Sequence, residues 1–105
     1  MAANTKAINQ IAINYVSDVR KVMPIDKVFL FGSYAKGTAD NQSDIDLCFF
    51  SHSFENQRSV DVVMKLMKLA NKYRGFDIEP HAFPTAELNN NNPFVKEILR
   101  TGKEL

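Results

Sequence analysis

The sequence lacks the features that mark membrane, secreted and zinc-binding proteins. It contains no run of eighteen apolar residues, so no segment is expected to span a membrane. Its N-terminus has no charged block followed by an apolar block, as a signal peptide would, and we expect a cytoplasmic protein. The single cysteine, Cys48, excludes an internal disulfide, and no spacing of His and Cys matches a zinc site.

An excess of charge of one sign is also missing, because 13 Lys and Arg are balanced by 12 Asp and Glu. A large nucleic-acid interface normally requires a basic patch, so direct nucleic-acid binding is not expected. Apolar residues make up 45% of the chain and are spread throughout it, which favours a folded domain over disorder. With 105 residues the chain can bury one core, and we predict a single domain over residues 1–105.

Apolar residues at helical spacing predict two main helices, over residues 5–22 and 54–74, the second closed by Gly75. Shorter helical segments are predicted at residues 34–36, 85–88 and 94–101.

Runs of β-branched and aromatic residues predict three strands. The strand at 27–31 is apolar at successive positions and is expected in the centre of the sheet. A second strand is predicted at 45–50. A third, at 76–83, is expected to lie at an edge or to bend away beyond Ile78, because Pro80 has no N–H group.

Asp44 and Asp46 stand at the start of the second predicted strand. Because side chains alternate along a strand, both carboxylates are expected on one face, while Ile45 and Leu47 turn toward a core. Two adjacent carboxylates repel each other unless a cation lies between them, and hard oxygen ligands suit Mg²⁺. The pair therefore predicts a metal site.

Gly32 and Ser33 lie between the first strand and the short helix. At such a bend, backbone N–H groups can bind a phosphate, and glycine lets the backbone approach closely. Gly-Ser and Asp-x-Asp are each weak signals alone, since the first is common in turns and the second in exposed strands. Within one local unit they predict a phosphate site beside a metal site.

The combined pattern, Phe31-Gly32-Ser33-Tyr34-Ala35-Lys36-Gly37 followed by Ser43-Asp44-Ile45-Asp46-Leu47, resembles the minimal nucleotidyltransferase domains of the DNA polymerase beta superfamily. The likeness extends over nearly the whole chain. It implies an α+β, two-layer fold of the polymerase beta-like nucleotidyltransferase type, in which a mixed sheet of about three to four strands packs against helices.

The resemblance also implies roles for individual residues. Gly32 and Ser33 would hold the β- and γ-phosphates of a nucleotide, and Asp44 and Asp46 would ligate two Mg²⁺ ions. A third carboxylate would share one ion and act on the attacking hydroxyl. Asp77 fits this role best because Phe76 and Ile78 flank it; Glu79, two residues on, is the alternative.

Three further residues have open roles. Lys36 would contact phosphate or brace the loop, and Ser43 would orient Asp44 or cap the turn. His81 follows the third predicted strand's acidic residues, so a role near the site is open.

The implied activity is Mg²⁺-dependent transfer of AMP from ATP to a hydroxyl group. The minimal family commonly works beside a HEPN-domain toxin, which the nucleotidyltransferase neutralises as an antitoxin, by binding or by transferring AMP to a tyrosine. Two alternatives stay open: a catalytically weak module that binds nucleotide and partner, and a transferase acting on a small molecule. The acceptor, the base preference and self-association are not fixed by the sequence.

Overall fold

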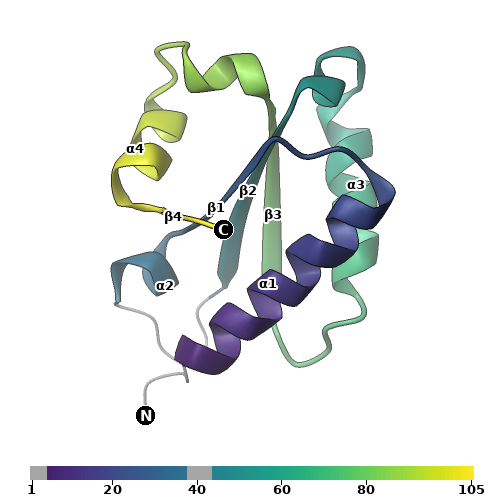
Figure 1. Cartoon of the computed structure of the whole chain (residues 1–105), viewed down its shortest axis with the longest axis vertical. Coiled ribbons are helices and arrows are strands. Elements are labelled where there is room, and N and C mark those ends of the chain that lie inside the picture. The colour runs from purple at the N-terminus through teal and green to yellow at the C-terminus, as the bar shows by residue number, and fades with distance from the viewer. Residues whose placement is uncertain (1–4, 38–43) are drawn as a thin grey trace.

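The computed structural model describes residues 5–37 and 44–105, in which helices pack on a four-stranded mixed sheet (Figure 1). The helices are α1 (Thr5–Val22), α2 (Ser33–Lys36), α3 (Ser59–Ala70) and α4 (Pro93–Thr101), with two 3-10 helices, η1 (His52–Asn56) and η2 (Thr85–Leu88). The strands are β1 (Lys27–Phe31), β2 (Ile45–Ser51), β3 (Ile78–Pro84) and β4 (Lys103–Glu104).

The sheet has the strand order β3-β2-β1-β4. β1 runs antiparallel to β2 and β4, whereas β2 and β3 are parallel. The register places Phe31, Asp46 and Glu79 side by side on the three strands β1, β2 and β3. We call Asp46 and Glu79, which come from separate parts of the sequence, the carboxylate row; Phe31 lies next to it on β1.

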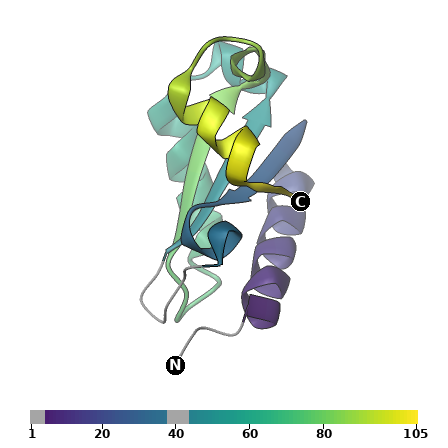
Figure 2. The ribbon, with the colours of Figure 1, turned by 90° about the vertical axis from the view of Figure 1, so that its left-hand side faces the viewer.

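Alternation along the strands divides the core between the two faces of the sheet. In Figure 2, α4 lies in front of the sheet, whereas α1 and α3 lie behind it. Residues such as Leu30 and Leu47 pack in the cluster that includes α1 and α3, while Phe29 and Cys48 pack with Val95 of α4. β1 and β2 are thus covered on both faces, which confirms the central position expected for the first strand.

None of the helices among the described residues is long and apolar enough to cross a membrane.

The second predicted helix is shorter than the periodicity suggested. The side chain of Ser51 accepts a hydrogen bond from the Ser53 N–H and caps the start of η1, and α3 begins only at Ser59. α3 then ends at Ala70, before the predicted stop at Gly75. Tyr73 has left the helix; its ring packs edge-on against Tyr15 at 5.9 Å and its hydroxyl donates to Asp18.

The third strand begins at Ile78, two residues later than predicted, and continues through Pro80 to Pro84. Its edge position is confirmed, but it does not end or turn away after Ile78. Because the Ile45 N–H donates to the Asp77 carbonyl, alternate pairing turns the backbone nitrogen of Pro80 to the outer edge. Proline therefore removes no hydrogen bond between β2 and β3.

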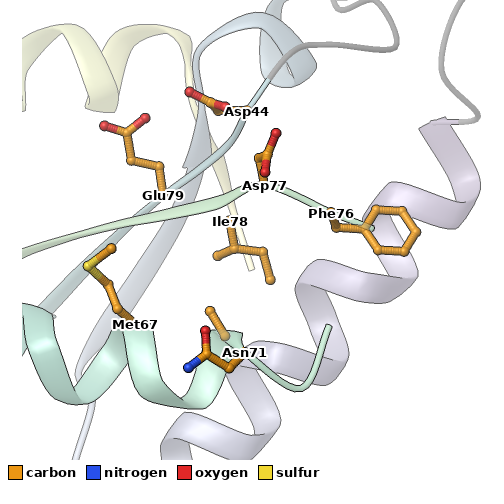
Figure 3. A pocket seen from close by; sticks show the side chains of 8 residues that line it. Asp44, Met67, Asn71, Phe76, Asp77, Ile78 and Glu79 are labelled. Atoms are coloured by element: carbon orange, nitrogen blue, oxygen red, sulfur yellow. The ribbon is translucent and has the colours of Figure 1, made fainter. Parts of the chain in front are cut away.

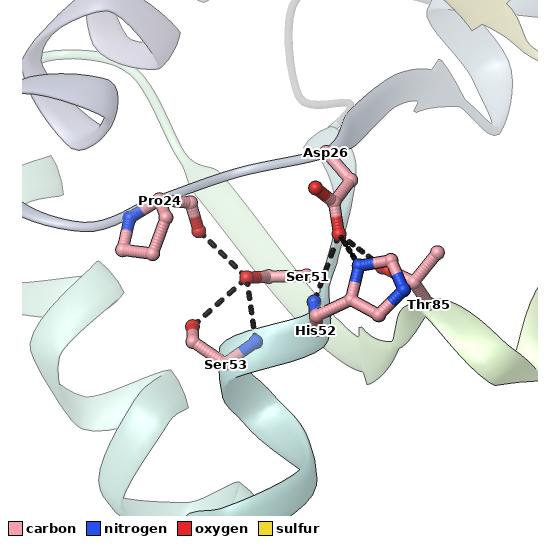
Figure 4. A network of polar contacts seen from close by, with 6 residues as sticks. All are labelled: Pro24, Asp26, Ser51, His52, Ser53 and Thr85. Carbon is pink, nitrogen blue, oxygen red and sulfur yellow. Dashed lines mark hydrogen bonds and ion pairs between the residues drawn. The ribbon is translucent and has the colours of Figure 1, made fainter.

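A polar network joins the start of β1 to the two 3-10 helices (Figure 4). One carboxylate oxygen of Asp26 accepts hydrogen bonds from the His52 N–H at 2.8 Å and the Thr85 hydroxyl at 2.6 Å. The same oxygen lies 2.6 Å from Nδ1 of His52. Next to it, the Ser51 hydroxyl donates to the Pro24 carbonyl at 2.7 Å, so this end of the sheet is held by side chains.

We expect Asp26→Asn to flatten the acid dependence of stability. The hydrogen bonds from Thr85 and His52 hold the pKa of Asp26 below its ordinary value of 3.8. The ionised carboxylate therefore stabilises the folded protein above that value, and this stabilisation is lost as the pH falls through the lowered pKa. On acidification from about pH 5 to about pH 2, the melting temperature of the wild type should fall more steeply than that of the variant.

Thermal unfolding followed by circular dichroism measures the two slopes. Asp61→Asn serves as a control, because Asp61 is exposed. Among the ion pairs of the described residues, its carboxylate takes part in one, with Arg58 at 3.9 Å. This control should keep the wild-type slope. Equal slopes for Asp26→Asn and the wild type would contradict the prediction.

Candidate active site

The carboxylate row places Asp46 and Glu79 directly opposite each other on two parallel strands. His81 follows two residues after Glu79 and therefore shares its face of the sheet. Ligand atoms of Asp46, Glu79 and His81 all lie within 4.8 Å of one another. Nε2 of His81 is 3.8 Å from Oε1 of Glu79. Two acids and an imidazole thus converge on one point.

The environment of Asp46 disfavours its negative charge. Burial raises the pKa of Asp46 to about 6, with the neighbouring carboxylates of Glu79 and Asp44 contributing to the rise. Burial lowers the pKa of His81, an effect that Glu79 opposes. The site therefore concentrates acceptor oxygens without a matching positive charge from the described part of the protein, and this donor set suits a hard divalent cation.

An open pocket of about 340 Å³ lies beside this row at the start of β3. Figure 3 shows that the carboxylates of Asp44, Asp77 and Glu79 lie toward one side of the backbone, while Ile78 points the other way. The rest of its lining comes from the end of α3 and the approach to β3: Met67, Ala70, Asn71, Phe76 and Ile78. Glu79 belongs both to this pocket and to the row with Asp46.

The four acidic residues singled out from the sequence thus come to one end of β2 and β3. The backbone hydrogen bond from Ile45 to Asp77 brings Asp77 close to Asp44, just before the strands begin. The register brings Glu79, and not Asp77, level with Asp46. The sequence favoured Asp77 because apolar residues flank it. Cross-strand register is a tertiary property, and the local spacing of residues does not report it.

Gly32 abuts the carboxylate row from the end of β1. Its φ of 74° and ψ of −150° belong to a region that only glycine occupies readily. A Cβ atom at this position would lie 2.3 Å from Oδ2 of Asp46, so the bend can approach the carboxylate only without a side chain. The glycine is needed for contact with Asp46 as well as for its conformation.

The rest of the Gly-Ser segment forms the short helix α2, which starts at Ser33. The Lys36 N–H donates to the Gly32 carbonyl at 3.0 Å, and Gly37 caps the helix in the left-handed conformation. Lys36 is exposed. The hydrogen bond from Arg100 is the main cause that lowers the pKa of Glu97, and the charge of Lys36 makes a smaller contribution in the same direction. Ser43 lies outside the described residues.

Aromatic rings next to the row were not identified from the sequence. The His81 ring centroid is 5.2 Å from that of Phe31 and 5.5 Å from that of Phe94, which belongs to α4. The sequence signal for Phe31 and Phe94 was limited to their place beside a strand end and a helix start. Their proximity depends on how α4 packs on the sheet.

Comparisons with known proteins agree with this architecture. A family model described as "Polymerase beta, Nucleotidyltransferase" matches residues 13–105. A structure from Sulfolobus solfataricus, assigned as a nucleotidyltransferase, is similar with a TM-score of 0.64 and 21% identity, covering 81% of this chain and 74% of that one.

Two mutants of the toxin–antitoxin complex MntA–HpeT are also similar, with TM-scores of 0.58 and 0.57 and identities of 20% and 22%. The matches cover 97% and 98% of this chain and 72% of each matched chain. At these identities the likeness is one of fold. No curated protein sequence matches the chain.

We expect Gly32→Ala to destabilise the protein more than Gly37→Ala does. Both glycines have positive φ, at 74° and 76°, so both substitutions strain the backbone. Only the methyl group at position 32 meets another group, Oδ2 of Asp46, whereas nothing lies within 4 Å of one at position 37. The expected losses of unfolding free energy are about 3 kcal/mol and about 1 kcal/mol, respectively.

Urea unfolding measures both losses, and NMR titration of Asp46 reports whether its carboxylate has moved. The pKa of Asp46 should change in Gly32→Ala and stay near 6 in Gly37→Ala. Equal losses together with an unchanged Asp46 titration in both variants would refute the close contact.

Proposed function

Because this chain belongs to the polymerase beta nucleotidyltransferase family, we propose that it transfers a nucleoside monophosphate, AMP from ATP, to a hydroxyl group. One observation carries this proposal: a glycine bend that excludes a side chain touches Asp46, which in turn faces Glu79. A phosphate-binding bend and a pair of carboxylates lying side by side are the parts that nucleotidyl transfer needs.

We assign Gly32 and Ser33 to the β- and γ-phosphates, where backbone N–H groups at the start of α2 and the missing side chain allow close approach. Asp44, Asp46 and a third carboxylate would hold Mg²⁺. When bound, the ions neutralise charge on the entering and leaving oxygens. The raised pKa of Asp46 supports this assignment, because a cation would relieve the crowding that contributes to it.

For the third carboxylate we propose Glu79 over Asp77. Glu79 is level with Asp46 across the strand pair, and the two side chains interact closely enough to affect the pKa of Asp46. Asp77 precedes Glu79 by two residues, just before β3 begins, and lines the pocket beside Asp44. Its proximity to Asp44 leaves it as the alternative ligand, while Lys36 and Ser43 would support the phosphate loop.

In the proposed step, the acceptor oxygen attacks the α-phosphorus of ATP. A new oxygen–phosphorus bond forms, the bond from the α-phosphorus to the oxygen that bridges to the β-phosphate breaks, and pyrophosphate leaves. The acceptor proton passes to the carboxylate of Glu79, which acts as general base. The protein's own contribution is chiefly to position the reactants and to provide fixed charges around them.

The acceptor that we propose is a tyrosine of a HEPN-domain toxin, so that the protein acts as an antitoxin and protein adenylyltransferase. The fold similarity to the toxin–antitoxin complex MntA–HpeT supports this choice of partner. A module that neutralises the toxin by binding alone is the second candidate, favoured by the open pocket. Transfer to a small molecule is the third.

We expect Asp44→Asn and Asp46→Asn each to reduce transfer of labelled AMP by at least about a hundredfold, because each removes a charged ligand from the site. Asp46→Asn should also raise the melting temperature of the metal-free protein at pH 7. The folded-state pKa of Asp46, about 6, lies above its ordinary value of 3.8, so ionisation weakens the fold as the pH rises through this interval.

Transfer is measured with labelled ATP, Mg²⁺ and the co-purified partner, and folding by circular dichroism. Asp61→Asn, an exposed substitution on α3, should leave both unchanged. Full activity in Asp44→Asn and Asp46→Asn would exclude the metal assignment. Absence of label on any product with the wild type would favour the binding module.

Glu79→Gln and Asp77→Asn distinguish the two candidates for the third carboxylate. If Glu79 accepts the proton, Glu79→Gln should lower the turnover number by about 100-fold or more, whereas Asp77→Asn should lower it by less than about tenfold. Single-turnover rates with saturating ATP make the comparison. The reverse order of the two effects would move the role to Asp77.

A further inference from the structure

A nitrogen ligand that the proposed transfer does not use stands beside the carboxylate row. Ligand atoms of Asp46, Glu79 and His81 all lie within 4.8 Å of one another, and Nε2 of His81 is 3.8 Å from Oε1 of Glu79. Among the described residues, neither Asp44 nor Asp77 belongs to this group. The set that the fold brings together is therefore two acids and an imidazole, and not the acids alone.

Strand pairing and ring packing hold this group in place. Glu79 and His81 lie two residues apart on β3 and share a face of the sheet, and Asp46 is level with Glu79 on β2. The His81 ring packs against the rings of Phe31 at 5.2 Å and Phe94 at 5.5 Å. The side chains of His81 and Glu79 are 30% and 53% exposed, so an ion can reach them from solvent.

The spacing of the ligand atoms suits one shared ion. Two atoms that each bind a tetrahedral ion at about 2.1 Å lie about 3.4 Å apart. The distance of 3.8 Å between Nε2 of His81 and Oε1 of Glu79 is close to this value, and it is too long for a hydrogen bond. Small rotations of the side chains would therefore bring the nitrogen and the carboxylate oxygens onto the same ion.

The chemistry of the three ligands favours a transition metal. Mg²⁺ takes oxygen ligands and keeps much of its water, so it has no need of an imidazole. Imidazole nitrogen suits Zn²⁺, which commonly has three protein ligands and an open position in solvent-accessible sites. We propose that Asp46, Glu79 and His81 form a binding site for Zn²⁺, in which His81 determines that this ion is preferred over Mg²⁺.

This site would make Zn²⁺ an inhibitor of the protein. Zn²⁺ would occupy Asp46 and Glu79, the carboxylates assigned above to Mg²⁺, so the two ions would exclude each other. A Glu79 carboxylate bound to Zn²⁺ could not accept the acceptor proton. The inhibition rests on the proposed nucleotidyl transfer, whereas the binding of Zn²⁺ rests only on the arrangement of the three side chains.

The two histidines of the chain allow the nitrogen ligand to be observed directly. When Zn²⁺ is added to the metal-free protein, we expect the ¹⁵N NMR signal of His81 Nε2 to shift as it does on coordination. Mg²⁺ should not cause this shift. His52, whose Nδ1 lies 2.6 Å from Asp26 at the other end of β1, should keep its signals in both titrations.

His81→Phe keeps a ring against Phe31 and Phe94 but removes the nitrogen. By calorimetric titration, its affinity for Zn²⁺ should be at least about tenfold weaker than that of the wild type, since loss of even an outer-shell partner costs that much. Its affinity for Mg²⁺ should be unchanged. His52→Gln is the matched control and should bind both ions as the wild type does.

Circular dichroism shows whether the variants fold, and His81→Asn tests the same loss of Zn²⁺ affinity with a polar side chain. In the transfer assay with Mg²⁺, added Zn²⁺ should inhibit the wild type and His52→Gln more strongly than His81→Phe.

The outcomes separate this inference from the proposed function. Equal Zn²⁺ affinity in the wild type, His81→Phe and His81→Asn, or no coordination shift at His81, would overturn the zinc site even where AMP is transferred with Mg²⁺. Transfer supported by Zn²⁺ as well as by Mg²⁺ would overturn the inhibition. A wild type that binds Zn²⁺ through His81 but transfers no AMP with Mg²⁺ would support the zinc site and refute the proposed transfer.

Discussion

Carboxylates gathered at one end of the sheet repel one another, and the rest of the fold must hold them together against this repulsion. Asp46 carries its charge against both partial burial and the fields of Glu79 and Asp44. The folded protein would be more stable with neutral groups in these positions. The acids stay close because strands β2 and β3 are locked in parallel register by the packing on the two faces of the sheet.

Each part of the fold contributes to holding that register. α1 and α3 cover one face of the sheet, and α4 covers part of the other. Far from the acids, Asp26 and Ser51 tie the start of β1 to the ends of β2 and β3 through side-chain hydrogen bonds (Figure 4). The strand ends that carry the acids therefore need few local contacts of their own, and the pocket can stay open.

The pattern of apolar residues predicted the elements well where a strand is apolar on both faces or a helix has one apolar stripe. Residues 27–31 and 5–22 have the predicted bounds, because their periodicity is set by burial within one element. The break between η1 and α3 depends on the Ser51 side chain, and the strand β4 is only two exposed residues long, so neither had a periodic signal. The pairing of Asp46 with Glu79 and the contact of Phe94 with His81 depend on register and helix packing, which a single sequence does not state.

Pro80 in the edge strand affects how readily the protein aggregates through the edge of its sheet. An exposed edge offers a ladder of N–H and C=O groups to which another chain can add a strand. At Pro80 that ladder lacks a donor on its outer side, within β3. Pro80 is also buried, so the edge is covered at this step, and both features discourage edge-to-edge aggregation while leaving the inner pairing, and the acids that it positions, intact.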